Sequence, residues 1–264
     1  MIRRGSRQLL AVLTALCWLA PAAAALDAQR LSGEDLALLS GAMARLVPLI
    51  DARKQQGTAC LLTWDELYAP LDEPQRAFLD AFRKLRGAEL GSTAHYFGDS
   101  AGGANLVPVG SQHTLKDGER VPIDTQFLPR PVAEAYERMM RAMERELGRR
   151  LLVESGYRSP AYQLYLFLYY LPNHDHSIRE TNRFVALPGH SEHGNPARQA
   201  IDFINEAGVN GEDHPEEFEA LPEYRWLTER AGDFGFALSY PRDNAYNTAF
   251  EPWHWHYRGP AAEP

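Results

Sequence analysis

Apolar residues recur at helical spacing in two segments near the start of the chain. In residues 31–54 the spacing places them on one face of a helix whose first turn Ser32 can cap: Leu36, Leu39, Met43, Leu46 and Leu49. A second helix is predicted over residues 73–86, which carry apolar side chains on one face. Residues 98–118 are rich in glycine and turn residues, so they predict a long loop or hairpin region.

The second half of the chain predicts helices that alternate with short strands. Pro131 suits the first turn of a helix that continues to about Arg149. Further helices are predicted over residues 159–171 and 217–234. Short apolar runs predict strands, which fall at residues 151–154, 200–204, 236–240 and 253–257. The alternation has no regular βαβ rhythm, so the predicted fold class is α+β.

The start of the chain has the composition of an export signal. Three arginines within the first seven residues precede an apolar run, residues 9–20, and small residues follow up to Ala25. This pattern predicts a secretory signal peptide at residues 1–25, cleaved near Ala24 or Ala25, and a periplasmic location for the exported protein. The apolar run is shorter than the ~20 residues that a membrane-spanning helix needs, so no stable membrane insertion is expected after cleavage.

Three parts are therefore expected: the signal peptide, an N-terminal helical extension (residues 26–125) packed on the main domain, and a catalytic domain (residues 126–264). The formal net charge of −8 argues against nucleic acid as a partner, because nucleic-acid binding needs basic surface. Removal of the signal peptide would leave Cys60 as the single cysteine, which excludes an intramolecular disulfide. No basic residue adjoins Cys60, so a buried, unreactive thiol is favoured.

Two short segments carry the candidate chemistry, PGHSEHGNPARQAIDF (residues 188–203) and EPWHWH (residues 251–256). Together they hold four of the nine histidines and several carboxylates. Imidazole and carboxylate are the usual zinc ligands besides thiolate, and a lone cysteine excludes a thiolate cluster. Three protein ligands with an open fourth position are typical of catalytic zinc. If the two segments meet in space, the pattern predicts a metallohydrolase.

Several motifs in one order make a resemblance specific. The runs SGYRSPAYQ (residues 155–163), PGHSEH…AID (residues 188–202) and GF…SYP…EPWH (residues 235–254) resemble the VanY-type zinc D-alanyl-D-alanine carboxypeptidases over roughly residues 130–258. The resemblance implies the fold that this family shares with the Hedgehog signalling domain, a small antiparallel sheet flanked by helices. It also implies Zn²⁺ as cofactor and a peptidoglycan stem peptide as substrate.

The resemblance also implies roles for individual residues. His193, Asp202 and His254 would be the metal ligands. Glu251 would be the general base that takes a proton from the attacking water. Arg158 would bind the substrate carbonyl and steady the developing oxyanion, a task that its fixed charge suits.

Three further residues are assigned to the substrate. By the same resemblance Gln163 and Ser191 match positions that hold the terminal D-alanine. His254 and His256 are two apart on a predicted strand and point to the same face, so either could reach a metal. The family's Glu-x-x-His spacing selects His254, which leaves His256 as a group behind the ligands or beside the substrate.

The chain departs from the family pattern at two places. The first His and the Asp of the motif are usually seven apart, whereas His193 and Asp202 are nine apart, and Arg198 and Gln199 stand where the pattern has no counterpart. A longer loop could still deliver Asp202. Ser239 stands where an arginine often precedes Tyr-Pro in the family.

The implied activity is removal of a C-terminal D-alanine from peptidoglycan stem peptides, and several alternatives stay open. An L,D-carboxypeptidase, a D,D-dipeptidase or an endopeptidase would differ only in pocket-closing loops. A protein of the same fold could instead bind the cell wall without catalysis, because of the altered loop after His193. GDSAGG, residues 98–103, also fits the G-x-S-x-G nucleophile elbow of a serine hydrolase with Ser100 as nucleophile. Its flanks do not predict the required strand and helix, so a surface loop is favoured.

For two other clusters we favour a structural interpretation over a functional one. His174 and His176 in PNHDHS could suggest a second metal site, but their flanking residues indicate a solvated loop. The aromatic residues of the predicted helix at 159–171 could stack on carbohydrate, but an aromatic helix face is usually core.

Overall fold

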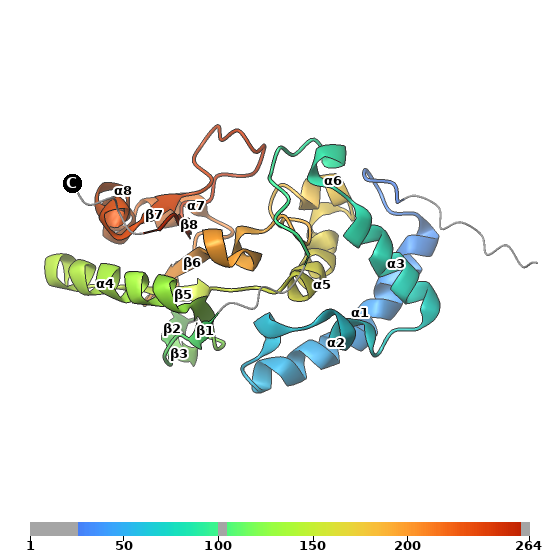
Figure 1. Ribbon diagram of the computed structural model, residues 1–264, viewed down its shortest axis with the longest axis horizontal. Coiled ribbons are helices and arrows are strands. Elements are labelled where there is room, and N and C mark those ends of the chain that lie inside the picture. Colours follow the sequence, from blue (N-terminus) through green and yellow to red (C-terminus); the bar gives the residue numbers. More distant parts are fainter. Residues whose placement is uncertain (1–25, 100–104, 260–264) are drawn as a thin grey trace, which may run out of the picture.

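The computed structural model describes residues 26–99 and 105–259 (Figure 1). The predicted signal peptide and Ser100 lie outside these ranges. Residues 26–99 are helical, in the order α1 (Gly33–Gln55), η1 (Ala59–Leu61), α2 (Trp64–Tyr68), α3 (Glu73–Lys84) and η2 (Gly87–Leu90). In the described ranges, no helix is both long enough and apolar enough to span a bilayer.

Helix α1 begins where the sequence predicts. The Ser32 side chain accepts a hydrogen bond from Asp35 N, and the Asp35 carboxylate accepts one from Ser32 N. This reciprocal capping box satisfies two amides of the first turn. Asp72 and Gln75 form the same box at the start of α3. The apolar faces of α1 and α3 then pack together, with α5 (Pro160–Tyr170) completing this first core.

A four-stranded antiparallel sheet organises the rest of the molecule. Its strand order is β5 (Leu151–Ser155), β6 (Ala200–Asn205), β8 (His254–Tyr257) and β7 (Phe236–Leu238). Two short antiparallel pairs lie outside it: β1 (Leu106–Pro108) with β4 (Phe127–Pro129), and β2 (His113–Lys116) with β3 (Glu119–Pro122). The α+β class, with a small antiparallel sheet flanked by helices and an N-terminal helical part, is confirmed.

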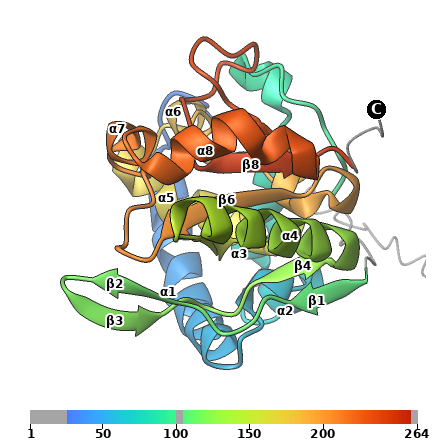
Figure 2. The same cartoon turned by 90° about the vertical axis from the view of Figure 1, so that its left-hand side faces the viewer.

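One face of this sheet forms a second core. Helices α4 (Arg130–Leu147) and α8 (Pro222–Arg230) lie along the sheet in Figure 2, and their apolar residues pack against those of β5, β6 and β8. Trp255 of β8 is buried in this core. Since side chains alternate along a strand, His254 and His256 project to the opposite face. That face is free to carry polar groups.

Residues 217–234 are mostly helical and end at Gly235, as predicted, but they do not form one continuous helix. The segment forms α7 (Pro215–Glu219), then α8, then a 3-10 turn, η6 (Ala231–Phe234). Leu221 is extended, with ψ of 141°, because a residue before proline disfavours the helical conformation. The remaining short helices are η3 (Leu171–His174) and α6 (Ile178–Thr181), with η4 and η5 in the loop before β6.

Candidate metal centre

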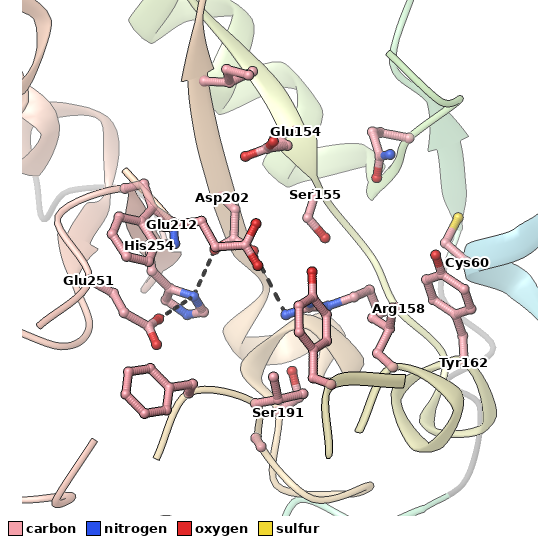
Figure 3. A pocket seen from close by; sticks show the side chains of 18 of the residues that line it. Cys60, Glu154, Ser155, Arg158, Tyr162, Ser191, Asp202, Glu212, Glu251 and His254 are labelled. Atoms are coloured by element: carbon pink, nitrogen blue, oxygen red, sulfur yellow. Dashed lines mark ion pairs between the residues drawn. The ribbon is translucent and has the colours of Figure 1, made fainter. Parts of the chain in front are cut away.

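Two neighbouring strands bring Asp202 and His254 together. Asp202 of β6 lies directly opposite His254 of β8 in the antiparallel register, so their side chains leave the same face side by side. His193 comes from η4 (Glu192–Gly194), the 3-10 helix in the preceding loop. One ligand atom from each of the three lies within 4.8 Å of the others. Figure 3 shows Asp202 and His254 with Glu251 and Arg158 beside them.

A second 3-10 helix takes up the nine-residue step from His193 to Asp202. This helix, η5 (Pro196–Arg198), follows η4 after one residue. The chain then joins the sheet at Gln199, whose carbonyl accepts a hydrogen bond from Tyr257 N. The longer loop thereby delivers Asp202 to His193, with 3.1 Å between Oδ2 and Nε2.

The hydrogen bond of His193 fixes which of its ring nitrogens is free. Nδ1 lies 2.7 Å from the carbonyl oxygen of Gly156. A carbonyl only accepts, so Nδ1 carries the proton and Nε2 presents a lone pair. Burial lowers the pKa of His193 to about 4, so the ring is neutral at pH 7. His193 is thus held neutral, with Nε2 available to a metal ion.

The lone pair of His193 Nε2 faces a second acceptor, Asp202 Oδ2. His193 Nε2 is buried and accepts no hydrogen bond from any of the described residues. Such groups are costly unless something satisfies them. A cation placed between the two residues would do so. The donor set of two imidazoles and one carboxylate is the one that a metal ion needs.

Carboxylates surround the ring of His254. Its Nδ1 lies 2.8 Å from Asp202 Oδ1 and 3.4 Å from Glu251 Oε2, and its Nε2 lies 3.2 Å from Glu192 Oε2. Burial disfavours a charged ring, but the three carboxylates outweigh burial and raise the pKa of His254 to about 10. Burial likewise opposes ionisation of Asp202, yet His193 and His254 hold its pKa well below the usual range. The centre therefore favours a positive charge.

Glu251 stands at the edge of the centre, in the turn before β8. Its backbone N–H donates to the Tyr240 carbonyl, and only 12% of its side chain is exposed. Burial raises the pKa of Glu251 to about 8. A carboxyl group with a pKa near neutrality can both take up and release a proton.

Arg158 reaches toward the centre from the segment between β5 and α5. Its Nη2 lies 3.8 Å from Asp202 Oδ2. The backbone N–H of Arg158 donates to the His193 carbonyl, and the next residue, Ser159, donates its N–H to the Cys60 carbonyl. The position of this fixed charge therefore depends on the N-terminal helical part as well as on the sheet.

A cavity of about 680 Å³ opens over the centre. The sheet and its neighbouring segments supply Arg158, Ser191, Asp202, Glu251 and His254 to its lining. The N-terminal helical part supplies the residues Lys54, Gly57, Ala59, Cys60, Gly87, Ser92 and Ala94. Cys60 is buried, as predicted, and burial raises its pKa to about 11, which disfavours the reactive thiolate.

Of the residues assigned to the substrate, Ser191 lines the cavity. Its Oγ accepts a hydrogen bond from His193 N at the start of η4. Gln163 is buried away from the cavity lining, and its Nε2 donates to the Ala186 carbonyl. Ala186 does line the cavity. A direct contact of Gln163 with substrate stays a prediction, whereas its support of the cavity wall is visible.

His256 lies behind the centre. Its Nδ1 is 2.7 Å from Ser239 Oγ and 3.8 Å from Glu192 Oε2, and the ring is buried. It does not line the cavity, so its predicted contact with substrate has no support in this geometry. Glu192 and Ser239 were not predicted as site residues. The signal for Glu192 was its place between Ser191 and His193 in the motif.

The alternative clusters stay apart from the centre. Within residues 26–99 and 105–259, the one group of three or more possible metal ligands is His193, Asp202 and His254. His174 stacks on Phe184 at a centroid distance of 4.7 Å. In α5, Tyr165 and Phe167 are buried in the first core, as predicted for an aromatic helix face. Tyr169 is exposed, and Tyr162 and Tyr170 line the cavity, so the prediction is wrong for that part of the face.

Comparisons with known proteins match the second half of the chain. The family model described as D-alanyl-D-alanine carboxypeptidase, VanY, matches residues 125–260. Over 145 residues the chain is 30% identical to YodJ of Bacillus subtilis (strain 168). The aligned region covers 53% of this chain and 50% of YodJ. Over 141 residues it is 31% identical to VanXYC of Enterococcus gallinarum, a bifunctional D-Ala-D-Ala dipeptidase and D-Ala-D-Ala carboxypeptidase. The aligned region covers 50% of this chain and 68% of VanXYC. The chain thus spans half the length of YodJ.

Two solved structures are similar to part of the chain. The LdcB LD-carboxypeptidase is 26% identical, with a TM-score of 0.47 over 59% of this chain and 68% of its own. A mutant of the D,D-pentapeptidase VanY from the VanB-type resistance cassette, in complex with Zn(II), is 26% identical, with a TM-score of 0.40 over 57% of this chain and 79% of its own.

Proposed function

Because the chain belongs to the VanY family of D-alanyl-D-alanine carboxypeptidases, we propose that it is a zinc-dependent carboxypeptidase that releases the C-terminal D-alanine of peptidoglycan stem peptides. One observation carries the proposal. The three predicted ligands His193, Asp202 and His254 come together, Asp202 and His254 line a cavity, and Glu251 and Arg158 lie beside them.

Zn²⁺ fits the residues that are present. Two nitrogens and one carboxylate oxygen are the ligand set of many catalytic zinc sites, which leave the fourth position open. The unpartnered His193 Nε2 would gain a partner in the ion. When bound there, zinc would supply Lewis-acid chemistry, lowering the pKa of a water molecule and polarising a carbonyl group.

Glu251 would act as general base and then as general acid. Its carboxylate accepts the proton of the attacking water at Oε2, the atom nearest His254. It then gives the proton to the amine of the departing D-alanine. Burial shifts its pKa toward neutrality, which lets one group perform both steps. General acid–base catalysis of this kind contributes a factor of about 10²–10⁴ to a rate.

Arg158 would stabilise the negative charge that develops on the substrate. The tetrahedral transition state of peptide hydrolysis places negative charge on the former carbonyl oxygen, and a fixed donor held toward that point stabilises it. Its guanidinium is 19% exposed, so water screens it little. Ser191, on the same wall of the cavity, offers a hydroxyl to the terminal D-alanine.

Digestion of defined muropeptides tests the proposal. A pentapeptide ending in D-Ala-D-Ala should lose one D-alanine, as seen by mass spectrometry. A chelator should stop the release and added Zn²⁺ should restore it. Release of the dipeptide D-Ala-D-Ala, or cleavage only of a tetrapeptide at its L,D-bond, would replace the specificity with that of a dipeptidase or an L,D-carboxypeptidase. Zinc binding without any cleavage would favour a non-catalytic cell-wall binding protein.

We also propose that the protein is exported to the periplasm after removal of residues 1–25, as the composition of that segment predicts. N-terminal sequencing of the protein from a periplasmic fraction should give a start just after Ala24 or Ala25. Recovery of the chain with its original N-terminus from the cytoplasm would contradict this location.

A further inference from the structure

A buried carboxylate lies on the far side of His254 from the cavity. Glu192 is 4% exposed, and its two oxygens have different partners. Oε1 accepts a hydrogen bond from Arg198 Nε at 2.6 Å. Oε2 accepts one from Ser239 Oγ at 2.5 Å and lies 3.2 Å from His254 Nε2. Three segments of the chain therefore converge on one side chain.

The two nitrogens of His254 face opposite ways. Nδ1 faces Asp202 and Glu251 in the centre, and Nε2 faces Glu192. A ring that ligates a metal through Nδ1 must carry its proton on Nε2, and that proton needs an acceptor. An outer carboxylate fixes both the tautomer and the orientation of such a ring.

We propose that Glu192 is a positioning residue, which holds His254 with its Nδ1 toward the metal site and its Nε2–H bound to the Glu192 carboxylate. The proposal rests on the proposed function, because it needs His254 to be a metal ligand. Glu192 does not line the cavity, so it acts through His254 and has no part in contacting substrate.

The partners of Glu192 keep its charge in place. A buried carboxylate is unstable without compensation, and Arg198 supplies a cation while Ser239 supplies a hydroxyl. Ser239 uses its one proton on Glu192, so the 2.7 Å contact with His256 requires the His256 Nδ1–H to donate to Ser239 Oγ. The hydrogen bonds therefore run from His256 to Ser239 and from Ser239 to Glu192.

Each of the two departures from the family pattern supplies a residue that donates a hydrogen bond to the Glu192 carboxylate. Arg198 belongs to the longer loop between His193 and Asp202, and Ser239 stands in place of the arginine before Tyr-Pro. In this chain the cation that pairs with Glu192 comes from the loop. The longer loop therefore has a function in the centre beyond spanning the distance.

A purely structural role would have a different signature. If Glu192 only tied the loop to β7 through Arg198 and Ser239, its loss would lower the stability of the metal-free protein and leave zinc affinity unchanged. A positioning role predicts weaker zinc binding and an altered ligand geometry. The two roles are separable by measurements that need no substrate.

The test compares Glu192→Gln with the wild-type chain. The amide keeps the size of the side chain but removes its charge. We expect zinc affinity, measured by competition with a chromogenic chelator, to fall about 10- to 100-fold. The visible spectrum of the Co²⁺-substituted protein, which reports ligand geometry, should also change. Glu223→Gln is the matched control, since Glu223 is 3% exposed and pairs with Arg149 at 3.7 Å outside the cavity. It should leave both readouts unchanged.

A second variant covers failure of the first to fold. Glu192→Asp keeps the charge but draws the carboxylate back by one methylene, so a smaller loss of zinc affinity, a few-fold, is expected. Zinc affinity and Co²⁺ spectrum equal to wild type in whichever variants fold would overturn the proposal. A wild-type protein that binds no zinc would overturn it together with the proposed function, whereas a zinc-binding wild type with indifferent variants removes only the role of Glu192.

Discussion

The two sides of the cavity differ in what they place near the centre. The sheet side, which comprises β5–β8 and their loops, carries groups whose pKa values are strongly shifted: His193, Asp202, Glu251 and His254. The helical side, residues 26–99, carries Lys54, several small residues and Cys60, whose pKa is raised mainly by burial. Titratable groups shifted by both burial and close charged partners cluster at functional sites. The candidate chemistry therefore lies on the sheet side, and the helical side forms the facing wall of the cavity.

The two sides meet at Ser159. Its N–H and its Oγ donate to the carbonyls of Cys60 and Leu62 on the helical side, and Arg158 precedes it on the sheet side. The comparison thus predicts three classes of variant. Changes on the sheet side should abolish turnover, changes at the joint should lower stability, and changes beside the centre should alter the response to pH.

The largest effect is expected for Asp202→Ala. The variant removes the carboxylate that bridges His193 and His254, so zinc binding and D-alanine release should both be lost. The core formed by α1, α3 and α5 should remain folded, because Asp202 is not part of it. Metal analysis and muropeptide digestion measure the two losses. Asp233→Ala, an exposed ion-pair partner of Arg230, is the control and should be active. Full zinc content in Asp202→Ala would contradict the ligand assignment.

Ser159→Ala should have the next largest effect, and on stability. The Ser159 hydroxyl donates to the Leu62 carbonyl and also caps α5 by accepting from Tyr162 N. Loss of a cap costs about 1 kcal/mol, and the unpaired buried carbonyl adds roughly 1 kcal/mol or more. Urea unfolding should show a decrease of about 2 kcal/mol with zinc content unchanged. Ser32→Ala removes a cap at the exposed start of α1 and should cost less. Equal losses in the two variants would show that the joint contributes nothing.

Glu154→Gln should give the smallest effect, seen only against pH. Burial raises the pKa of Glu154, beside the centre, to about 7 from an unfolded value near 4.5. A carboxyl group with a raised folded pKa stabilises the fold fully below pH 4.5, and this contribution is lost as the pH rises through 7. The metal-free wild type should thus become less stable as the pH rises from about 5 to about 8, with a slope of at most about 1.4 kcal/mol per pH unit from this one group.

Urea unfolding of metal-free Glu154→Gln should show a flatter pH dependence, with the variant more stable than wild type at about pH 8. Glu229→Gln, an exposed member of a helical ion pair, controls for the charge change and should follow the wild-type curve. A pH dependence in Glu154→Gln as steep as that of the wild type would assign the titration to another group.

Local signals predicted most of the elements. The cap at Ser32 and the apolar spacing after it place α1 correctly, because capping and periodicity act within a few residues. Residues 217–234 are mostly helical, as predicted, and Pro222 accounts for the break between α7 and α8. The class followed from the alternation of elements, whereas the strand order β5-β6-β8-β7 depends on pairings between segments far apart in the sequence.

The candidate centre divides in the same way. The types of ligand could be predicted from the two motifs, but their meeting depends on the register that sets Asp202 opposite His254. Glu192 could not be assigned because its partners, Arg198 and Ser239, come from the loop before β6 and from the residue after β7, which only the fold brings together. The assignment of Gln163 to substrate came from resemblance alone, and the structure turns its amide toward Ala186.

Glu251→Gln tests the central claim most directly, because it separates metal binding from proton transfer on the sheet side. Zinc content and D-alanine release should be measured on the same preparations of the variant and the wild type. The account predicts equal zinc content and a kcat lower by about 10²–10⁴-fold, since the amide cannot take the proton of the attacking water. A Glu251→Gln protein that holds zinc and turns over like the wild type would contradict it.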